Sequence, residues 1–227
     1  MVKGRFLEGI NNTKEKISSI DFDAHWYRRV FHAFGASFLF YYMLPDLEWI
    51  NFLKLTIPPI IVIFALLLEI LRIKGYISSS HFFGLRMYEK KRIGSYVFFA
   101  VGILILLTFF PQQIAIPCIL CACLGDPIIG EIRRGYNEKY VYFVGFLVCL
   151  FFFMITWYKA NIWLFLLVSI VGSTGAMIGE TKKFKWLDDD FMIQFVPAIL
   201  IGIIWIAIPL IGFNYPDQII YPFLWPW

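Results

Sequence analysis

Acidic residues stand at the ends of long apolar segments, where a carboxylate is costly unless a partner or a cation compensates its charge. Glu69, Asp126 and Glu180 each close an apolar segment, and the run Asp188–Asp190 opens the last one. Three consecutive aspartates fit a helix N-terminus, but they also resemble the carboxylate clusters that bind divalent cations. The sequence therefore predicts that these acids end at one depth and form one metal site, whose candidate ligands are Asp126, Glu131, Asp188 and Asp189.

The stretch 125–135, GDPIIGEIRRG, combines two acids, two arginines and three glycines. On a helix, Asp126, Gly130, Arg133 and Arg134 share one face, because they are spaced by four, seven and eight residues. The acid can hold a divalent cation, the arginines can bind phosphate oxygens, and the glycine lets a phosphate approach closely. The same pattern also fits a plain helix end with a capping acid and flanking arginines, so the residues alone favour neither interpretation.

Two other polar features are weaker candidates. His32 lies just inside the first apolar segment, where a lone histidine is more often a packing residue than a ligand. The loop that contains Arg86, Lys90 and Arg92 could bind phosphate, and it is equally typical of a connector that meets anionic lipid.

The composition indicates that membrane-spanning helices position these groups. The chain has 227 residues, of which 60% are hydrophobic, and its mean hydropathy is +0.72. A helix that crosses a bilayer needs about 20 mostly apolar residues, and several segments qualify. We expect an all-α integral membrane protein with about seven transmembrane helices, at residues 30–44, 52–73, 94–110, 113–130, 140–158, 161–180 and 191–212.

The basic residues predict the orientation of these helices. If the seven segments alternate across the bilayer, 18 of the 20 Lys and Arg residues fall on one side. The positive-inside rule then places the N-terminus in the cytoplasm and the C-terminus outside. Basic residues flanked by membrane helices also argue against nucleic-acid binding. The expected location is a multi-pass position in a cell membrane or, in a eukaryote, the endoplasmic reticulum, with the polar site facing the cytoplasm.

Three parts of the chain follow from this division. Residues 1–29 form a polar cytoplasmic arm, residues 30–212 form a single membrane domain, and residues 213–227 form an aromatic tail that suits the membrane interface. The four cysteines lie in apolar segments and are expected to be packing residues.

The order of the polar elements resembles the family of dolichol kinase, phytol kinase and CTP-dependent diacylglycerol kinase. The similar elements are the basic residues and histidine of 28–32, Glu69 with Arg72, the segment 92–99, the GDP stretch at 125–135, and Glu180 followed by Asp188–Asp190. The resemblance covers roughly residues 28–200. Asp190 stands where the family usually has asparagine.

The resemblance implies transfer of a phosphoryl group from CTP to the hydroxyl of a membrane lipid alcohol, with Mg²⁺ as the cofactor. The alcohol would be a polyprenol, a phytol-type alcohol or diacylglycerol, reaching the site from the bilayer. The implied catalytic residues are Asp126, Glu180 and Asp189. The implied nucleotide-binding residues are Arg86, Lys90, Arg92, Gly125, Gly130, Arg133 and Arg134, and further polar residues of the site are His32, Glu69, Arg72 and Asp190.

Two alternatives stay open at this point. A cytidylyltransferase that makes a CDP-lipid would also carry a Gly-Asp and basic element near a cytoplasmic helix end. An ion-coupled transporter would use Glu69, Asp126 and Glu180 as ion sites, although such sites usually lie near the middle of the bilayer. The sequence leaves the oligomeric state open.

Overall fold

The fold is an all-helical bundle in the part of the chain that the computed structural model describes, residues 24–79, 82, 85, 89, 91–181 and 187–223. Residues 24–42 form two consecutive helices with no loop between them, and residues 112–132 form three. The elements are α2 (Ala24–Phe34), the 3₁₀ helix η1 (Gly35–Tyr42), α3 (Glu48–Ile73), α4 (Ser95–Phe109), α5 (Gln112–Leu120), the π-helical turn η4 (Cys121–Gly125), α6 (Asp126–Ile132), α7 (Glu138–Trp157), α8 (Ile162–Thr181), α9 (Asp189–Ala207) and η5 (Pro209–Ile211).

Five helical stretches among the described residues are long and apolar enough to cross a membrane. They are Glu48–Ile73, Gln112–Ile132, Glu138–Trp157, Ile162–Thr181 and Asp189–Ala207. Each matches one of the segments expected from the sequence, with ends that differ by a few residues. The structure therefore supports a multi-pass membrane protein with five candidate spans, where the sequence predicted about seven.

The two remaining segments are helical, but neither forms a long apolar helix, for separate reasons. α4 has only 15 residues, which gives a length of about 22 Å, because Pro111 follows soon after it and the chain turns into α5. The first segment contains a polar α2 followed by eight residues of 3₁₀ helix. Because a 3₁₀ helix rises about 2 Å per residue, residues 24–42 still extend over roughly 32 Å.

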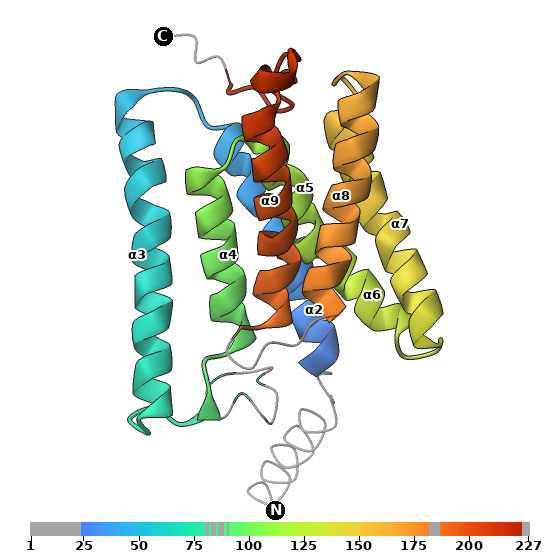
Figure 1. Ribbon diagram of the computed structural model, residues 1–227. Coiled ribbons are helices and arrows are strands. Elements are labelled where there is room, and N and C mark those ends of the chain that lie inside the picture. Colours follow the sequence, from blue (N-terminus) through green and yellow to red (C-terminus); the bar gives the residue numbers. More distant parts are fainter. Residues whose placement is uncertain are drawn as a thin grey trace, which may run out of the picture.

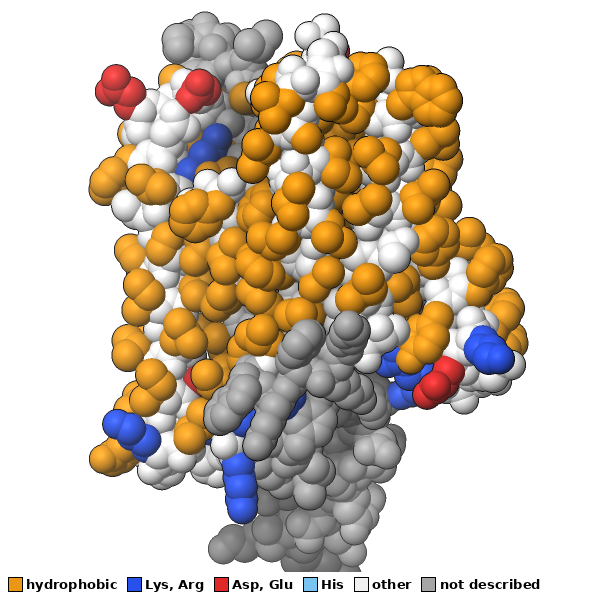
Figure 2. Space-filling model, in the orientation of Figure 1, with side chains coloured by type: hydrophobic (Ala, Val, Ile, Leu, Met, Phe, Trp, Pro, Cys, Tyr) orange, Lys and Arg blue, Asp and Glu red, His pale blue; other side chains and the backbone are white. Residues whose placement is uncertain are grey.

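The helices lie side by side and form one bundle (Figure 1). α9 packs against α8, α4 and α5, and α8 packs against α7. α3 stands at one edge of the bundle and exposes many of its apolar side chains, including Phe52, Ile60 and Ile63. Figure 2 shows hydrophobic side chains along the middle of the visible face and several Lys and Arg side chains near its lower end. This distribution suits a protein whose middle lies in hydrocarbon.

Two buried glutamines attach the segment after α9 to the bundle. Gln113 donates through Nε2 to the carbonyl oxygens of Pro216 and Asp217, at 2.9 and 3.1 Å. Gln112 accepts from the backbone N–H of Ile220 at 2.9 Å and donates to the carbonyl of the same residue. The predicted tail 213–227 is therefore held against the start of α5 through residues 216–220, while residues 224–227 lie outside the described part.

The contact between α8 and α9 depends on the glycine at position 179. A Cβ atom at Gly179 would lie 2.3 Å from the carbonyl oxygen of Met192, a backbone atom that cannot move without shifting α9. Gly179→Ala should therefore destabilise the protein by about 1–3 kcal/mol, as overpacking of a close contact typically does. Gly202→Ala, on α9, is the matched control because its new methyl group meets a neighbour at an ordinary 3.4 Å.

Thermal unfolding in detergent measures both variants. The expected result is a lower midpoint for Gly179→Ala and an unchanged or higher midpoint for Gly202→Ala, because alanine favours a helix over glycine. Equal midpoints for Gly179→Ala and the parent protein would show that the two helices are not packed as described.

Candidate functional site

A polar pocket of about 270 Å³ lies at the end of the bundle where α2 and α9 begin and α6 ends. Its walls come from three helices that are far apart in the sequence. They include the four residues of 125–135 that the helical spacing predicted to share one face. The lining residues are Arg28, Arg29, His32, Asp126, Pro127, Gly130, Arg133, Arg134 and Asp189.

The backbone around the GDP stretch is irregular in a way that positions Asp126. The backbone N–H of Asp126 donates to the carbonyl of Cys121, which is the i to i−5 pattern of a π-helical turn. Pro127 follows as an early residue of α6, where its missing N–H and fixed φ are tolerated. One extra residue in the turn rotates α6 relative to α5, and α6 then directs Asp126, Gly130 and Arg133 toward the pocket.

A buried charge network joins α2 to the start of α9. Arg28 donates to Asp190 Oδ2 at 3.3 Å and to Ser95 Oγ at 3.1 Å. His32 Nε2 lies 3.7 Å from the same Asp190 oxygen, and the His32 ring contacts Phe99 with centroids 4.6 Å apart. Asp190 is only 1% exposed, so the Arg28 guanidinium compensates a carboxylate that would otherwise be very costly.

Two groups of side chains have the geometry to hold a cation. His32, Asp126 and Asp190 each offer a ligand atom within 4.8 Å of the others, and so do Asp188, Asp189 and Asp190. Asp190 Oδ1 is buried and has no hydrogen-bond partner among the described residues. An orphaned buried carboxylate oxygen beside two further carboxylates fits a hard divalent cation such as Mg²⁺.

Three arginines at the pocket and its rim pair with carboxylates. Arg133 donates to Glu180 Oε1 at 2.7 Å, and Glu180 Oε2 is buried without a partner among the described residues. Arg92 donates to Asp188 Oδ2 at 2.8 Å. Arg29 pairs with Glu131, which is exposed. Arg133 lines the pocket and keeps about two-fifths of its side chain exposed, so it can also contact a ligand there.

The pKa values at the pocket respond to this crowding. Burial and the neighbouring carboxylates of Asp189 and Asp190 raise the pKa of Asp188 to about 8, against the opposing effect of the hydrogen bond that Asp188 accepts from the backbone N–H of Asp190. Burial lowers the pKa of Arg133, but its hydrogen bond and ion pair with Glu180 outweigh that effect, and the net result is a raised pKa. A bound cation would favour the charged form of the aspartates by the same Coulomb attraction.

Glu69 and Arg72 form a separate buried cluster. Arg72 contacts both carboxylate oxygens of Glu69, at 3.0 and 2.5 Å, and both side chains are nearly inaccessible. Glu69 also accepts from the backbone N–H of Gly94 and from the Tyr96 hydroxyl. Arg72 donates to the carbonyls of Glu89 and Arg92. The cluster therefore ties the end of α3 to the chain just before α4, and it holds the backbone of Arg92, whose side chain reaches Asp188.

The predicted site residues divide into five groups. Asp126, Gly130, Arg133, Arg134, Asp189 and His32 line the pocket, and Asp188, Asp190, Glu180 and Arg92 contact or neighbour its lining residues. Glu69 and Arg72 lie in the separate cluster. Gly125 is buried beside Cys149 and Glu131 is exposed, and neither lines the pocket. Arg86 and Lys90 lie outside the described residues.

The list of site residues predicted from the sequence omitted Arg28 and Arg29, although both line the pocket. The spacing of Arg28 and His32 by four residues was a usable signal, because it places both on one helical face. No local signal points to the contact between Arg28 and Asp190, since the two residues are 162 positions apart. The four cysteines are buried and free of disulfides, consistent with packing residues.

The arrangement suits a ligand that carries phosphate groups and a divalent cation. Four arginines and a histidine face two aspartates across one small pocket. Arginines bind phosphate oxygens through paired hydrogen bonds, and aspartates hold the cation that bridges such oxygens. Among the described residues, a Cβ atom added at Gly130 would meet no atom within 4 Å beyond the backbone of its own helix, so there is open space beside that part of α6.

Comparisons of the chain with models of protein families, with curated proteins and with solved structures found no match.

Proposed function

We propose that this protein is a kinase that phosphorylates the hydroxyl of a membrane lipid alcohol at its cytoplasmic face. The observation that supports this function is the pocket itself, in which Arg28, Arg133 and Arg134 lie beside Asp126 and Asp189 at one end of an apolar bundle. Phosphoryl transfer requires mainly positioning and charge neutralisation, and these residues supply both. The resemblance of the polar elements to lipid-alcohol kinases points to the same reaction.

The reaction would bring together a nucleotide in the pocket and a lipid alcohol from the bilayer. The alcohol oxygen attacks the γ-phosphorus of the nucleotide, the bond from that phosphorus to the β,γ-bridging oxygen breaks, and the hydroxyl proton passes to a carboxylate, with Asp189 and Asp126 as candidates. The products are a lipid phosphate and a nucleoside diphosphate. Asp190 belongs to both groups that have the geometry for a cation, so it would hold Mg²⁺ together with Asp188 and Asp189, or with Asp126 and His32. The ion would neutralise phosphate charge. The arginines stabilise the negative charge on the transferred group.

CTP is the proposed donor, on the strength of the resemblance. The sequence has no Gly-x-x-x-x-Gly-Lys-Ser/Thr loop and no kinase glycine-rich loop, so side chains rather than a phosphate-binding loop must hold the polyphosphate. Purified protein in detergent, given labelled CTP or ATP, Mg²⁺ and a panel of polyprenols, phytol-type alcohols and diacylglycerol, tests both function and donor. Labelled lipid phosphate is the expected product. If excess unlabelled ATP suppresses labelling from CTP as well as unlabelled CTP does, the selectivity for CTP is wrong.

The transporter alternative fits the geometry less well. Ion-coupled carriers bind their ions near the middle of the bilayer, where helices are interrupted. In this bundle the acids gather at one end, at the start of α9 and the junction before α6. The position of the pocket therefore favours a site that meets a water-soluble ligand on one side of the membrane.

The proposed topology has seven passes with the N-terminus in the cytoplasm, counting α4 and the combined α2 and η1 as passes. It predicts that Asn12→Cys, in a cysteine-free background, reacts with a membrane-impermeant thiol reagent only after the cells are opened. No disulfide is lost in the cysteine-free background, because all four native cysteines are free thiols. Labelling of residue 12 from outside intact cells would contradict this orientation.

Arg133→Ala should raise the Michaelis constant for the nucleotide by roughly ten- to a hundredfold, because a hydrogen bond to a charged group contributes about 1.5–3 kcal/mol. The constant for the lipid should change little. Lys139→Ala is the matched control, since Lys139 is an exposed cation at the start of α7 outside the pocket. Steady-state kinetics on both variants measure the effect, and an unchanged nucleotide constant for Arg133→Ala would remove this residue from the nucleotide site.

A further inference from the structure

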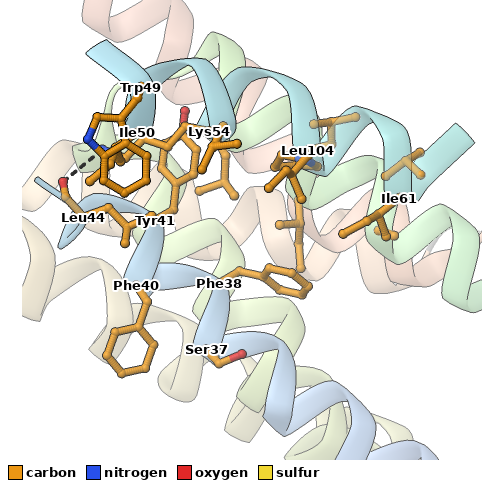
Figure 3. Close-up of a pocket in the computed structure, with 17 residues that line it drawn as sticks. Ser37, Phe38, Phe40, Tyr41, Leu44, Trp49, Ile50, Lys54, Ile61 and Leu104 are labelled. Carbon is orange, nitrogen blue, oxygen red and sulfur yellow. Dashed lines mark hydrogen bonds between the residues drawn. The ribbon is translucent and has the colours of Figure 1, made fainter. Parts of the chain in front are cut away.

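An apolar groove of about 430 Å³ runs between η1, α3 and α4 (Figure 3). It extends from Trp49 to Val62 along α3, which corresponds to a length of about 20 Å. Most of its lining is aliphatic or aromatic, and its polar side chains are Ser37, Tyr41 and Lys54. Lys54 is engaged within the groove, where it donates to the carbonyl of Leu44 at 3.0 Å.

The groove opens sideways to the surface of the bundle. Phe38, Phe40 and Leu53 line it and are exposed, and so are Ile57 and Ile61 on the same side of α3. α3 is the least buried of the five candidate spans among the described residues. In a bilayer the groove therefore meets hydrocarbon, and an extended apolar chain can enter it from the side.

Two of the three elements that line the groove pass beside the polar pocket. On the first helical run, Arg28 and His32 belong to the pocket, and the groove begins at Ser37, five residues further along. On α4, Ser95 accepts from Arg28 and Phe99 contacts His32, and the groove begins at Ala100. The separation along these helices is about 8–10 Å.

We propose that this groove holds the hydrocarbon chain of the lipid alcohol, an inference that rests on the proposed kinase function. If the hydroxyl lies in the pocket and the chain lies in the groove, the molecule must span the separation of about 8–10 Å between them and then extend about 20 Å along the groove. A volume of about 430 Å³ spread over that length accommodates one extended chain. The substrate is therefore a long single-chain alcohol of the prenol type rather than the two-chain diacylglycerol.

Selectivity in this groove comes from packing rather than from the hydrophobic effect. A hydrocarbon chain that leaves the groove enters lipid tails that are equally apolar, so its transfer from lipid into the groove contributes little to the binding free energy. Close contact with rigid aromatic side chains such as Phe38 and Tyr41 favours a chain of fitting width and length. Short alcohols end before the groove and lose these contacts.

Photochemical crosslinking tests the groove without relying on catalysis. The probe is a long-chain prenyl alcohol with a diazirine at the tail end, added to the purified protein in lipid nanodiscs, and labelled residues are located by mass spectrometry. We expect labelling to concentrate on groove residues of η1, α3 and α4 and to fall when unlabelled prenyl alcohol is added in excess. Labelling that is spread evenly over outward residues of α3 such as Ile60 and Ile63, without competition, would overturn the proposal.

A pair of variants sharpens this test. Leu104→Trp places an indole inside the groove and should reduce the competed label by about tenfold or more, because an overpacked site excludes the chain. Ile63→Trp, on the lipid-facing side of α3, should leave it unchanged. Equal labelling of the two variants would contradict a chain in the groove. The protein could also show groove labelling that unlabelled alcohol reduces, yet transfer no phosphate from any nucleotide. That result would support the groove as a lipid site and contradict the proposed kinase function.

Discussion

Asp126→Asn is expected to lower lipid phosphorylation by about a thousandfold or more while the protein still folds and inserts. The substitution keeps the size of the side chain and removes the negative charge that faces His32 and Asp190 in the candidate cation group. Loss of one preorganised charge at a phosphoryl-transfer site typically costs on the order of a hundred- to a thousandfold in rate, and more where a bound cation is also lost.

Initial rates of lipid phosphate formation at saturating Mg²⁺ and nucleotide measure this effect. Glu138→Gln is the matched control, because Glu138 is an exposed acid in the first turn of α7 and does not line the pocket. Circular dichroism and size-exclusion behaviour in detergent verify that the Asp126 variant is folded. A folded Asp126→Asn protein with full turnover would place the reaction elsewhere.

Arg72→Met should destabilise the protein by about 3–5 kcal/mol, the typical cost of leaving one partner of a buried ion pair uncompensated. Glu69 is fully buried, and Arg72 supplies two of its hydrogen bonds. Adding Glu69→Gln to Arg72→Met removes the unpaired charge, while the glutamine oxygen can still accept from Gly94 or Tyr96. The double variant should therefore regain about 1–3 kcal/mol relative to Arg72→Met.

Unfolding by titration with a denaturing detergent compares these proteins. Lys74→Met serves as the control, because Lys74 is an exposed cation two residues beyond Arg72, and surface changes of this kind usually stay within about 0.5 kcal/mol. If Arg72→Met and Lys74→Met unfold alike, the Glu69 and Arg72 cluster does not carry the stabilising role described. If the double variant is less stable than Arg72→Met, the destabilisation does not arise from an unpaired Glu69 charge.

The sequence predicted the helices well because the bilayer imposes a simple length rule on apolar segments. The segments 140–158 and 161–180 correspond to α7 and α8 within a few residues. The rule does not say which of the helices are shielded by their neighbours. α4 is only 15 residues long, yet Val97, Phe99 and Leu106 are buried within the bundle.

Local spacing predicted one wall of the pocket, and only the tertiary fold supplies the rest. Asp126, Gly130 and Arg133 could be placed together because a helix repeats every 3.6 residues. The partner of Asp190 could not be found this way, because Arg28 reaches it from the first helix. The prediction that the acids end at one depth in the membrane also did not distinguish Glu69 from the acids at the pocket. Its neighbour Arg72, three residues away, was the local indication that it has a partner of its own.

The most direct test of the proposed function is to follow which phosphorus of CTP reaches the lipid. The protein is incubated with Mg²⁺, a long-chain prenyl alcohol or the corresponding lipid phosphate, and CTP labelled either at the γ-phosphorus or at the α-phosphorus. A kinase transfers the γ label to the alcohol and leaves the α label in the water-soluble nucleotide. We expect that result, and we expect it to disappear in Asp126→Asn. Transfer of the α label to the lipid phosphate would identify a cytidylyltransferase, and transfer of neither label, nor of the γ label of ATP, to any lipid would contradict the assignment of this pocket to phosphoryl transfer.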